Sequence, residues 1–186
     1  MIQNLLQKVD KILLGGAMIF TFYKAKDYEI GKSLFDEHNV IMAKMIANNE
    51  KILLPVDVVI ANEETKEANI RTVEVDSIPP DTRGLDIGER SVQSFKELLK
   101  DAKTVIWNGP LGYIEVGDFA KATKEMAEFL AESKAKVIVC GGDTTGFVDN
   151  LGLRDKYYLV STGGGASMIL LEGKKLPAIE ALENQS

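Results

Sequence analysis

The chain has 186 residues, 45% of them hydrophobic, which is enough for one domain with a sizeable core. Its 22 Lys and Arg against 28 Asp and Glu give a formal net charge of −6, which disfavours nucleic acid and anionic membrane surfaces as partners. No apolar run approaches the ~20 residues that a membrane-spanning helix needs, and the N-terminus lacks the layout of a signal peptide. With Cys140 as the one cysteine, these features predict a cytoplasmic protein without an internal disulfide.

The residue inventory also limits the chemistry. With one His (His38, among polar neighbours) and one Cys, a Ser-His-Asp triad, a Cys-His pair or a zinc cluster would need unusual substitutes. None of the four arginines falls in a glycine-rich loop, so a bidentate clamp for a small phosphorylated acid is hard to assemble.

Residues 1–61 carry alternating helix and strand signals. An apolar stripe over 2–9 predicts a helix, 11–14 a short strand, and Gly15-Gly16-Ala17 the turn into an apolar helix. Ser33, with Asp36 three residues on, resembles a capping box and predicts a helix that runs to about Asn48. Pro55 is expected to split two strands, over 51–54 and 57–61.

The middle of the chain is predicted to be less regular. Residues 62–69 are charged and polar, which is typical of an exposed loop. The alternation over 71–75 predicts an edge or half-exposed strand. Residues 78–88 hold two prolines and two glycines and are predicted to form an irregular surface loop. A helix is expected from Glu89, with these side chains facing inward: Val92, Phe95, Leu98 and Leu99.

The last part of the chain repeats a strand, a glycine turn and a helix. The β-branched and aromatic run over 104–107 predicts a strand buried on both faces, followed by a turn at Asn108-Gly109-Pro110 and a helix near Gly117. Two more units follow, with strands over 136–139 and 158–160, and the last helix is expected to reach Glu172 and be capped by Gly173. This alternation predicts an α/β fold, Rossmann-like and three-layer α/β/α, with a mainly parallel sheet.

The glycine-rich loops at these junctions favour an anion site. Gly163, Gly164 and Gly165 let backbone N–H groups converge at a helix N-terminus; a tight turn, the alternative, would need only one or two glycines. Gly141-Gly142-Asp143-Thr144 adds a carboxylate and a hydroxyl, which suits a phosphate chain that carries Mg²⁺, although Asp143 as a helix N-cap is about equally favoured by this loop alone.

Two weaker signals precede these loops. Gly15 and Gly16 could offer a flat surface to an aromatic base, or simply close a strand against a helix. Glu115 could accept hydrogen bonds from ribose hydroxyls, or be a solvated charge before a helix. The fingerprints of P-loop enzymes and of the usual dinucleotide-binding fold are absent, which disfavours an NAD-dependent dehydrogenase.

Taken together, the motifs resemble the C-terminal, nucleotide-binding domain of phosphoglycerate kinase, over essentially the whole length 1–186. Seven segments carry the resemblance, and they follow one another in the same order as in the family: 13–18, 28–34, 54–59, 84–88, 107–112, 141–144 and 160–167.

The resemblance implies an enzyme that transfers a phosphoryl group between 1,3-bisphosphoglycerate and Mg-ADP, giving 3-phosphoglycerate and Mg-ATP. It implies an adenine pocket lined by Gly15, Gly16, Leu34, Gly84, Leu85 and Pro110. Asn108 would lie near the phosphates, Glu115 would hold the ribose, Gly141 would also belong to the nucleotide site, and Asp143 would help hold Mg²⁺. Near the transferred phosphoryl group it implies Gly142, Thr144, Gly163, Gly164 and Gly165.

The sequence also departs from the family pattern. The family's N-terminal domain, whose arginines and histidine bind phosphoglycerate, is missing here, as are a first strand and its lysines. We therefore expect a nucleotide-binding domain that is incomplete at its N-terminal edge and is catalytically inactive alone. The open sheet edge could support self-association. The alternative is a folded structural fragment that binds no nucleotide.

Overall fold

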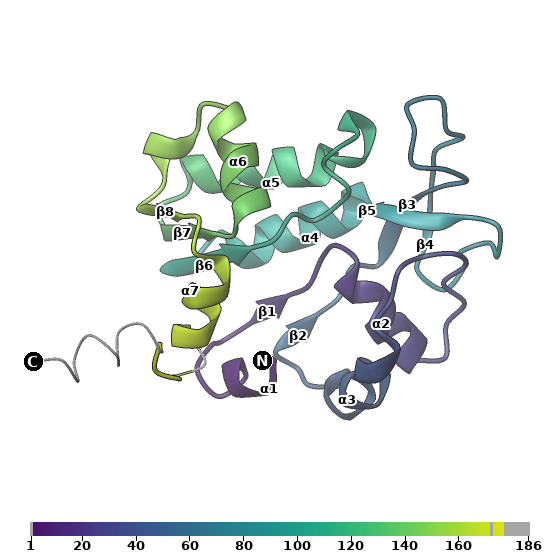
Figure 1. Cartoon of the computed structure of the whole chain (residues 1–186), viewed down its shortest axis with the longest axis horizontal. Coiled ribbons are helices and arrows are strands. Elements are labelled where there is room, and N and C mark those ends of the chain that lie inside the picture. The colour runs from purple at the N-terminus through teal and green to yellow at the C-terminus, as the bar shows by residue number, and fades with distance from the viewer. Residues whose placement is uncertain (1, 172, 177–186) are drawn as a thin grey trace, which may run out of the picture.

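The computed structural model describes residues 2–171 and 173–176 and has an α/β architecture (Figure 1). Its first half contains α1 (Ile2–Leu5), β1 (Ile12–Leu13), α2 (Met18–Ala25), the 3-10 helix η1 (Glu37–Asn39), α3 (Val40–Ile46), β2 (Ile52–Leu53), β3 (Asp57–Ala61), β4 (Arg71–Glu74) and β5 (Arg83–Ile87). Its second half contains α4 (Glu89–Leu99), β6 (Thr104–Asn108), the 3-10 helix η2 (Gly117–Phe119), α5 (Lys121–Glu132), β7 (Lys136–Cys140), α6 (Gly142–Asn150), the 3-10 helix η3 (Arg154–Lys156), β8 (Leu159–Ser161) and α7 (Gly164–Leu171).

The parallel strands predicted from the alternation are present in two sheets. One sheet has the order β6-β7-β8, and the other pairs β1 with β2. In the first sheet Asn108 pairs with Cys140 and Cys140 pairs with Ser161, so the carboxyl ends of all three strands are aligned. In Figure 1, α5 and α6 lie above this sheet, while α2 and α3 lie on the opposite side of the molecule, packed against each other.

A third sheet, antiparallel with the order β4-β3-β5, corrects one prediction. Residues 78–88 are not an irregular loop throughout, because 83–87 form β5, which pairs with β3 from Val58↔Ile87 to Ala61↔Arg83. The two prolines lie before the strand, and Ile87 is 2% exposed. β4 is the edge strand that the alternation predicted, and the strand break at Pro55 is also confirmed.

The expectation that 104–107 is buried on both faces was wrong. In the described part of the chain β6 pairs only with β7, and Thr104 and Ile106 are exposed, Ile106 at 38%. Burial of a strand depends on neighbours that its own residue types do not specify. Leu98, expected to face inward on α4, is likewise exposed, whereas Val92 and Phe95 are buried.

The predicted capping box at Ser33 was also wrong. The Ser33 hydroxyl instead accepts a hydrogen bond from Gly84 N at 2.9 Å, because tertiary pairing with β5 outcompetes a local cap. Regular α-helix begins only at Val40, after η1, where Asp36 accepts a hydrogen bond from His38 N at 3.0 Å. The first helix covers 2–5 rather than 2–9. The predicted helix end at Glu172 lies outside the described residues.

The core fills the space between these helices and sheets. Its fully buried side chains include Tyr23, Phe119, Ile19, Ile60, Ile87, Val58, Val92, Val137, Val139 and Val148. Within the described ranges, no helix combines the length and the apolar character that crossing a bilayer requires.

Candidate functional site

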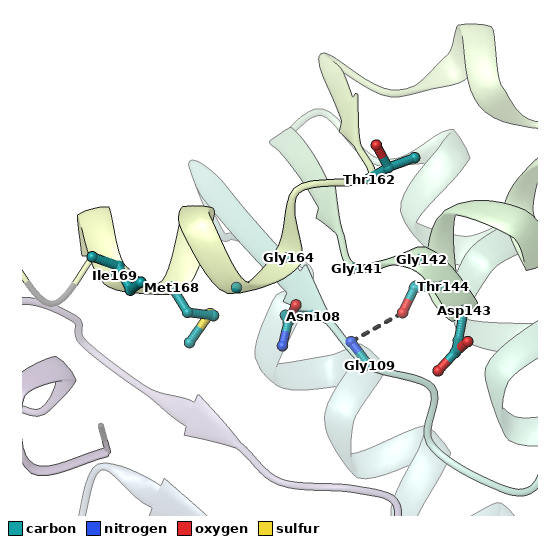
Figure 2. A pocket seen from close by; sticks show the side chains of 11 residues that line it. Asn108, Gly109, Gly141, Gly142, Asp143, Thr144, Thr162, Gly164, Met168 and Ile169 are labelled. Carbon is teal, nitrogen blue, oxygen red and sulfur yellow. Dashed lines mark hydrogen bonds between the residues drawn. The ribbon is translucent and has the colours of Figure 1, made fainter. Parts of the chain in front are cut away.

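A cavity of about 600 Å³ lies at the aligned carboxyl ends of β6, β7 and β8. Because α6 begins at Gly142 and α7 at Gly164, two helix N-termini, each the start of a helix of eight or more residues, meet there. Figure 2 shows Asn108 below the loops that carry Gly141 and Gly164, with Met168 and Ile169 along α7. The lining residues are Asn108, Gly109, Gly141, Gly142, Asp143, Thr144, Thr162, Gly164, Gly165, Met168 and Ile169.

Two glycines allow these loops to approach each other. Gly141, at the N-cap of α6, has φ +92°, a backbone conformation that other residues adopt only with strain. A Cβ on Gly164 would lie 2.6 Å from Gly141 Cα and 3.1 Å from Asn108 Oδ1. A side chain at Gly164 would therefore push the β7–α6 and β8–α7 loops apart. Gly142 and Gly165 have no atom within 4 Å of such a Cβ, so they present bare backbone to open space.

Thr144 holds the turn at the end of β6. Its side chain has no exposed surface, and its hydroxyl accepts a hydrogen bond from Gly109 N at 2.9 Å, drawn as the dashed line in Figure 2. The hydroxyl that sequence reasoning assigned to the ligand thus has a protein partner already. It fixes the Asn108–Pro110 turn against the first turn of α6.

Charge at this cavity comes from one side chain. Asp143 is exposed in the first turn of α6, and the described lining holds no Lys or Arg. The described residues contain no group of three or more His, Cys, Asp or Glu that could hold a metal ion. A single carboxylate nevertheless fits Mg²⁺ bound with a nucleotide, because such ions take one or two carboxylates plus phosphate oxygens and waters.

A second group of predicted residues converges on the loop after β6. Gly16 N donates to Leu111 O at 2.9 Å, and a Cβ on Gly16 would lie 3.0 Å from Pro110 O. Leu85 O accepts a hydrogen bond from Tyr113 N at 2.7 Å. Gly84, which precedes Leu85 on β5, packs so closely on Phe20 that a Cβ on Gly84 would overlap the Phe20 ring. The β1–α2 turn, β5 and the β6–η2 loop therefore meet, beside the cavity rather than in its lining.

Three further predicted residues, besides those around the loop after β6, are outside the lining of the first cavity. Leu34 is 70% exposed and lines a second cavity, of about 470 Å³, formed with residues of α1, α2 and α3. Glu115 is exposed on the β6–η2 loop. Gly163 is exposed at the end of β8 and is not part of the lining, although Gly164 and Gly165 are.

Comparisons with known proteins decide the family. The family model described as phosphoglycerate kinase matches residues 1–174. The chain belongs to the phosphoglycerate kinase family. Phosphoglycerate kinase of Trichodesmium erythraeum is 50% identical, over 99% of this chain and 48% of that protein. That of Fusobacterium nucleatum is 49% identical, over 99% of this chain and 47% of that protein. The chain spans about half the length of these relatives.

Solved phosphoglycerate kinase structures share the fold. The enzyme from Coxiella burnetii matches with a TM-score of 0.89 and 38% identity, over 96% of this chain and 47% of the other. The enzyme from Pyrococcus horikoshii OT3 matches with a TM-score of 0.83 and 25% identity, over 98% of this chain and 47% of the other. The similarity confirms both the resemblance stated from the motifs and the Rossmann-like α/β fold.

Sequence reasoning missed the burial of the Asp86 carboxylate. Asp86 on β5 is 3% exposed, and burial raises its pKa to about 7, although hydrogen bonds from Ala122 N and Ile87 N lower it. The segment 84–88 was noticed as a motif, but a residue assigned to a surface loop gave no reason to expect a buried charge. Strand pairing with β3 was the missing information.

Proposed function

We propose that residues 1–186 are the nucleotide-binding, C-terminal portion of a cytoplasmic phosphoglycerate kinase, incomplete at its N-terminal edge. The whole enzyme would transfer a phosphoryl group between 1,3-bisphosphoglycerate and Mg-ADP, giving 3-phosphoglycerate and Mg-ATP in glycolysis. The observation that carries this proposal is the cavity on which the N-termini of α6 and α7 meet at aligned strand ends. Family membership supplies the identity of the reaction.

At the phosphate end, the bare backbones of Gly142 and Gly165 would donate N–H groups to phosphate oxygens, and Gly164 would keep the two loops close enough to share one phosphate chain. Gly141 and Gly163 would shape the two turns, Asn108 would lie beside the phosphates, and Thr144 would hold Gly109 in place. This assignment suits phosphoryl transfer, which asks a protein mainly for positioning and electrostatic stabilisation.

At the base end, the adenine would lie where the β1–α2 turn, β5 and the β6–η2 loop meet. Gly15, Gly16, Gly84, Leu85 and Pro110 would form its walls, Leu34 would extend them, and the exposed carboxylate of Glu115 would accept hydrogen bonds from the ribose hydroxyls. The glycines support this role indirectly: without side chains, the β1–α2 turn, β5 and the β6–η2 loop pack closely against Leu111, Phe20 and Pro110, which would hold the walls of the pocket in place.

Asp143 is the candidate Mg²⁺ ligand. Its carboxylate is exposed beside the cavity, where it can meet a cation that the phosphates also hold. A bound Mg²⁺ would neutralise part of the charge that develops on the phosphoryl oxygens. Asp143 would orient the nucleotide's phosphates toward the N-termini of α6 and α7.

Phosphoglycerate would bind outside residues 1–186. The described cavity lining offers no Lys or Arg for its phosphate and carboxylate, and anionic substrates of this size are normally held by such side chains. We therefore predict that the 186-residue chain alone shows no phosphoglycerate kinase turnover in a coupled assay. Family-like turnover by the purified, mass-verified chain would contradict this part of the proposal.

Binding of Mg-ADP by the chain alone is the direct test of the nucleotide site. We expect a saturable calorimetric titration that Gly16→Ala weakens at least tenfold, because an alanine there must adopt φ near +61° against Pro110 O. Gly117→Ala is the matched control, since a Cβ at Gly117 meets open space. No heat from the well-folded chain would favour the alternative, a structural fragment that binds no nucleotide.

We also propose that the free edge of β6 can pair with a second copy of the chain. Its support is that β6 pairs only with β7 in the described part, with Ile106 38% exposed. Light scattering should detect a dimer whose population falls in Ile106→Lys, because an edge lysine opposes strand pairing. A monomer at all concentrations would contradict this. Nucleic acid and membrane play no part in the proposal.

A further inference from the structure

Asp86 is a carboxylate that the nucleotide-site assignment does not use. It lies on β5, one residue after Leu85, with 3% of its surface exposed. Burial raises its pKa, and the charged group that acts against this rise is Lys121 of α5, itself paired with Asp118 at 3.1 Å. A buried carboxyl group is costly unless it is hydrogen-bonded, so its contacts indicate what it does.

Both carboxylate oxygens accept hydrogen bonds from backbone. Oδ1 accepts one from Ile87 N at 2.9 Å, and Oδ2 accepts one from Ala122 N at 3.0 Å. Ala122 lies in the first turn of α5, whose N-cap residue, Ala120, makes no side-chain capping bond. Asp86 therefore caps α5 from a neighbouring strand and joins β5 to that helix.

The loop after β6 is packed onto the same carboxylate. A Cβ on Gly112 would overlap Asp86 Oδ1, so the loop backbone lies directly against it. On one side Tyr113 N donates to Leu85 O at 2.7 Å, and on the other Leu111 N donates to Thr123 Oγ1 at 3.0 Å. Residues 111–113 are thus clamped between β5 and the first turn of α5, with Asp86 at the point where the two join.

The clamp reaches the base end of the site through Leu111. Leu111 O accepts the hydrogen bond from Gly16 N at 2.9 Å, and a Cβ on Gly15 would overlap the Leu111 side chain. We propose that Asp86 is a positioning residue of the nucleotide site: it fixes β5, α5 and loop 111–113 so that Leu111 sets the β1–α2 turn. The proposal rests on the nucleotide-binding function proposed above.

The chain contains a matched control. Asp57 on β3 is 4% exposed and caps α4 in the same way, accepting hydrogen bonds from Ser91 N at 2.9 Å and Arg90 N at 3.2 Å. A Cβ on Gly88 would overlap the Asp57 carboxylate, as one on Gly112 would overlap Asp86. The hydrogen bonds recorded for the Asp57 carboxylate go to Arg90 and Ser91 of α4, not to the loops assigned to the nucleotide. Asn in place of either residue keeps the volume and removes one acceptor.

The experiment compares Asp86→Asn with Asp57→Asn in the full 186-residue chain. We expect Asp86→Asn to speed hydrogen exchange of the Gly16 and Tyr113 amides at least tenfold and to weaken Mg-ADP binding at least fivefold. Asp57→Asn should leave both within about twofold, once exchange is normalised to each variant's global stability. Equal effects of the two variants would overturn the proposal, because Asp86 would then be a helix cap alone.

A second measurement uses the native Asp86 and covers the case in which Asp86→Asn does not fold. The chain with His38→Gln lacks its only histidine, so near pH 7 the Asp86 carboxyl carbon should titrate with few competing groups. We expect the Gly16 and Tyr113 amide signals to follow the same midpoint without nucleotide. Amides that ignore the titration would overturn the proposal. If instead the amides respond and Mg-ADP does not bind, the positioning stands and the nucleotide function fails.

Discussion

The base end and the phosphate end of the proposed site are built differently. At the base end, glycines are packed against other parts of the chain, with Gly16 N 2.9 Å from Leu111 O and Tyr113 N 2.7 Å from Leu85 O. At the phosphate end, a cavity of about 600 Å³ is lined by open glycines and the Asp143 carboxylate, with no Lys or Arg among its described residues. The described chain therefore preorganises the base end, whereas charge balance at the phosphate end must come with the ligand or from elsewhere.

The largest expected effect concerns the buried charge behind the base end. Burial raises the pKa of Asp86 to about 7, above its ordinary value of 3.8, so the folded state binds more protons than the unfolded state between these values. Its contribution to stability is therefore full below about pH 4 and is lost as pH rises through about 7. The loss is on the order of 4 kcal/mol for three pKa units.

Urea unfolding from pH 4 to 8 tests this, because Asp86→Asn removes the titrating group. The free energy of unfolding of the wild type should fall relative to that of Asp86→Asn as pH rises through this window. A difference between the two proteins that stays constant with pH would show that Asp86 does not titrate in the fold as described.

Next in size is the contact between the two glycine loops at the phosphate end. Gly164→Ala should weaken Mg-ADP binding at least tenfold, about 1.4 kcal/mol, because the added Cβ would lie 2.6 Å from Gly141 Cα. Gly146→Ala is the control, since its Cβ meets open space on α6 and alanine favours a helix. Equal calorimetric affinities for the two variants would show that the loops need not be close.

Mg²⁺ should affect binding at the phosphate end and not at the base end. Because the described lining supplies no cationic side chain, we expect removal of Mg²⁺ to weaken ADP binding about tenfold while the affinity for adenosine stays unchanged. Asp143→Asn should abolish most of this Mg²⁺ dependence, and Asp155→Asn, an equal change of charge at an exposed site, should preserve it. An Asp143→Asn chain with the full Mg²⁺ effect would remove Asp143 from the metal site.

The smallest expected effect is on stability. Thr144→Val should lower the free energy of unfolding by about 1 kcal/mol, since it leaves Gly109 N without its acceptor. Thr144→Ser keeps the hydroxyl and should restore most of the loss in thermal unfolding. A Thr144→Val chain as stable as the wild type, beside a destabilised Thr144→Ser chain, would show that packing of the methyl group rather than the hydrogen bond holds the turn.

The features that sequence predicted well are local. A β-branched run, two or three glycines and an apolar helix face predicted the β7–α6 and β8–α7 junctions, which the structure brings to one cavity. Alignment of the strand ends then follows from parallel pairing, so Asn108, Asp143 and Gly164 could be expected together. The strand break at Pro55 was also predicted locally, because a proline has no backbone N–H to donate within a sheet.

The features that sequence did not predict depend on distant partners. β5 looked like a loop because its pairing with β3, which decides its state, is not encoded in its own residues. Ile106 looked buried because its type suits a covered strand, while its exposure depends on what lies beside β6. Ser33 resembled a cap, but its hydroxyl bonds Gly84, 51 residues away. Tertiary contacts override local propensity in all three cases.

The most direct test of the account is a titration of the 186-residue chain with Mg-ADP, followed through backbone amide signals. We predict saturable shifts at Gly141–Thr144 and Gly163–Gly165, together with Gly15, Gly16 and Glu115, and no comparable shifts around Asp57 on β3. Flat signals at these positions in a well-folded chain would contradict the nucleotide site.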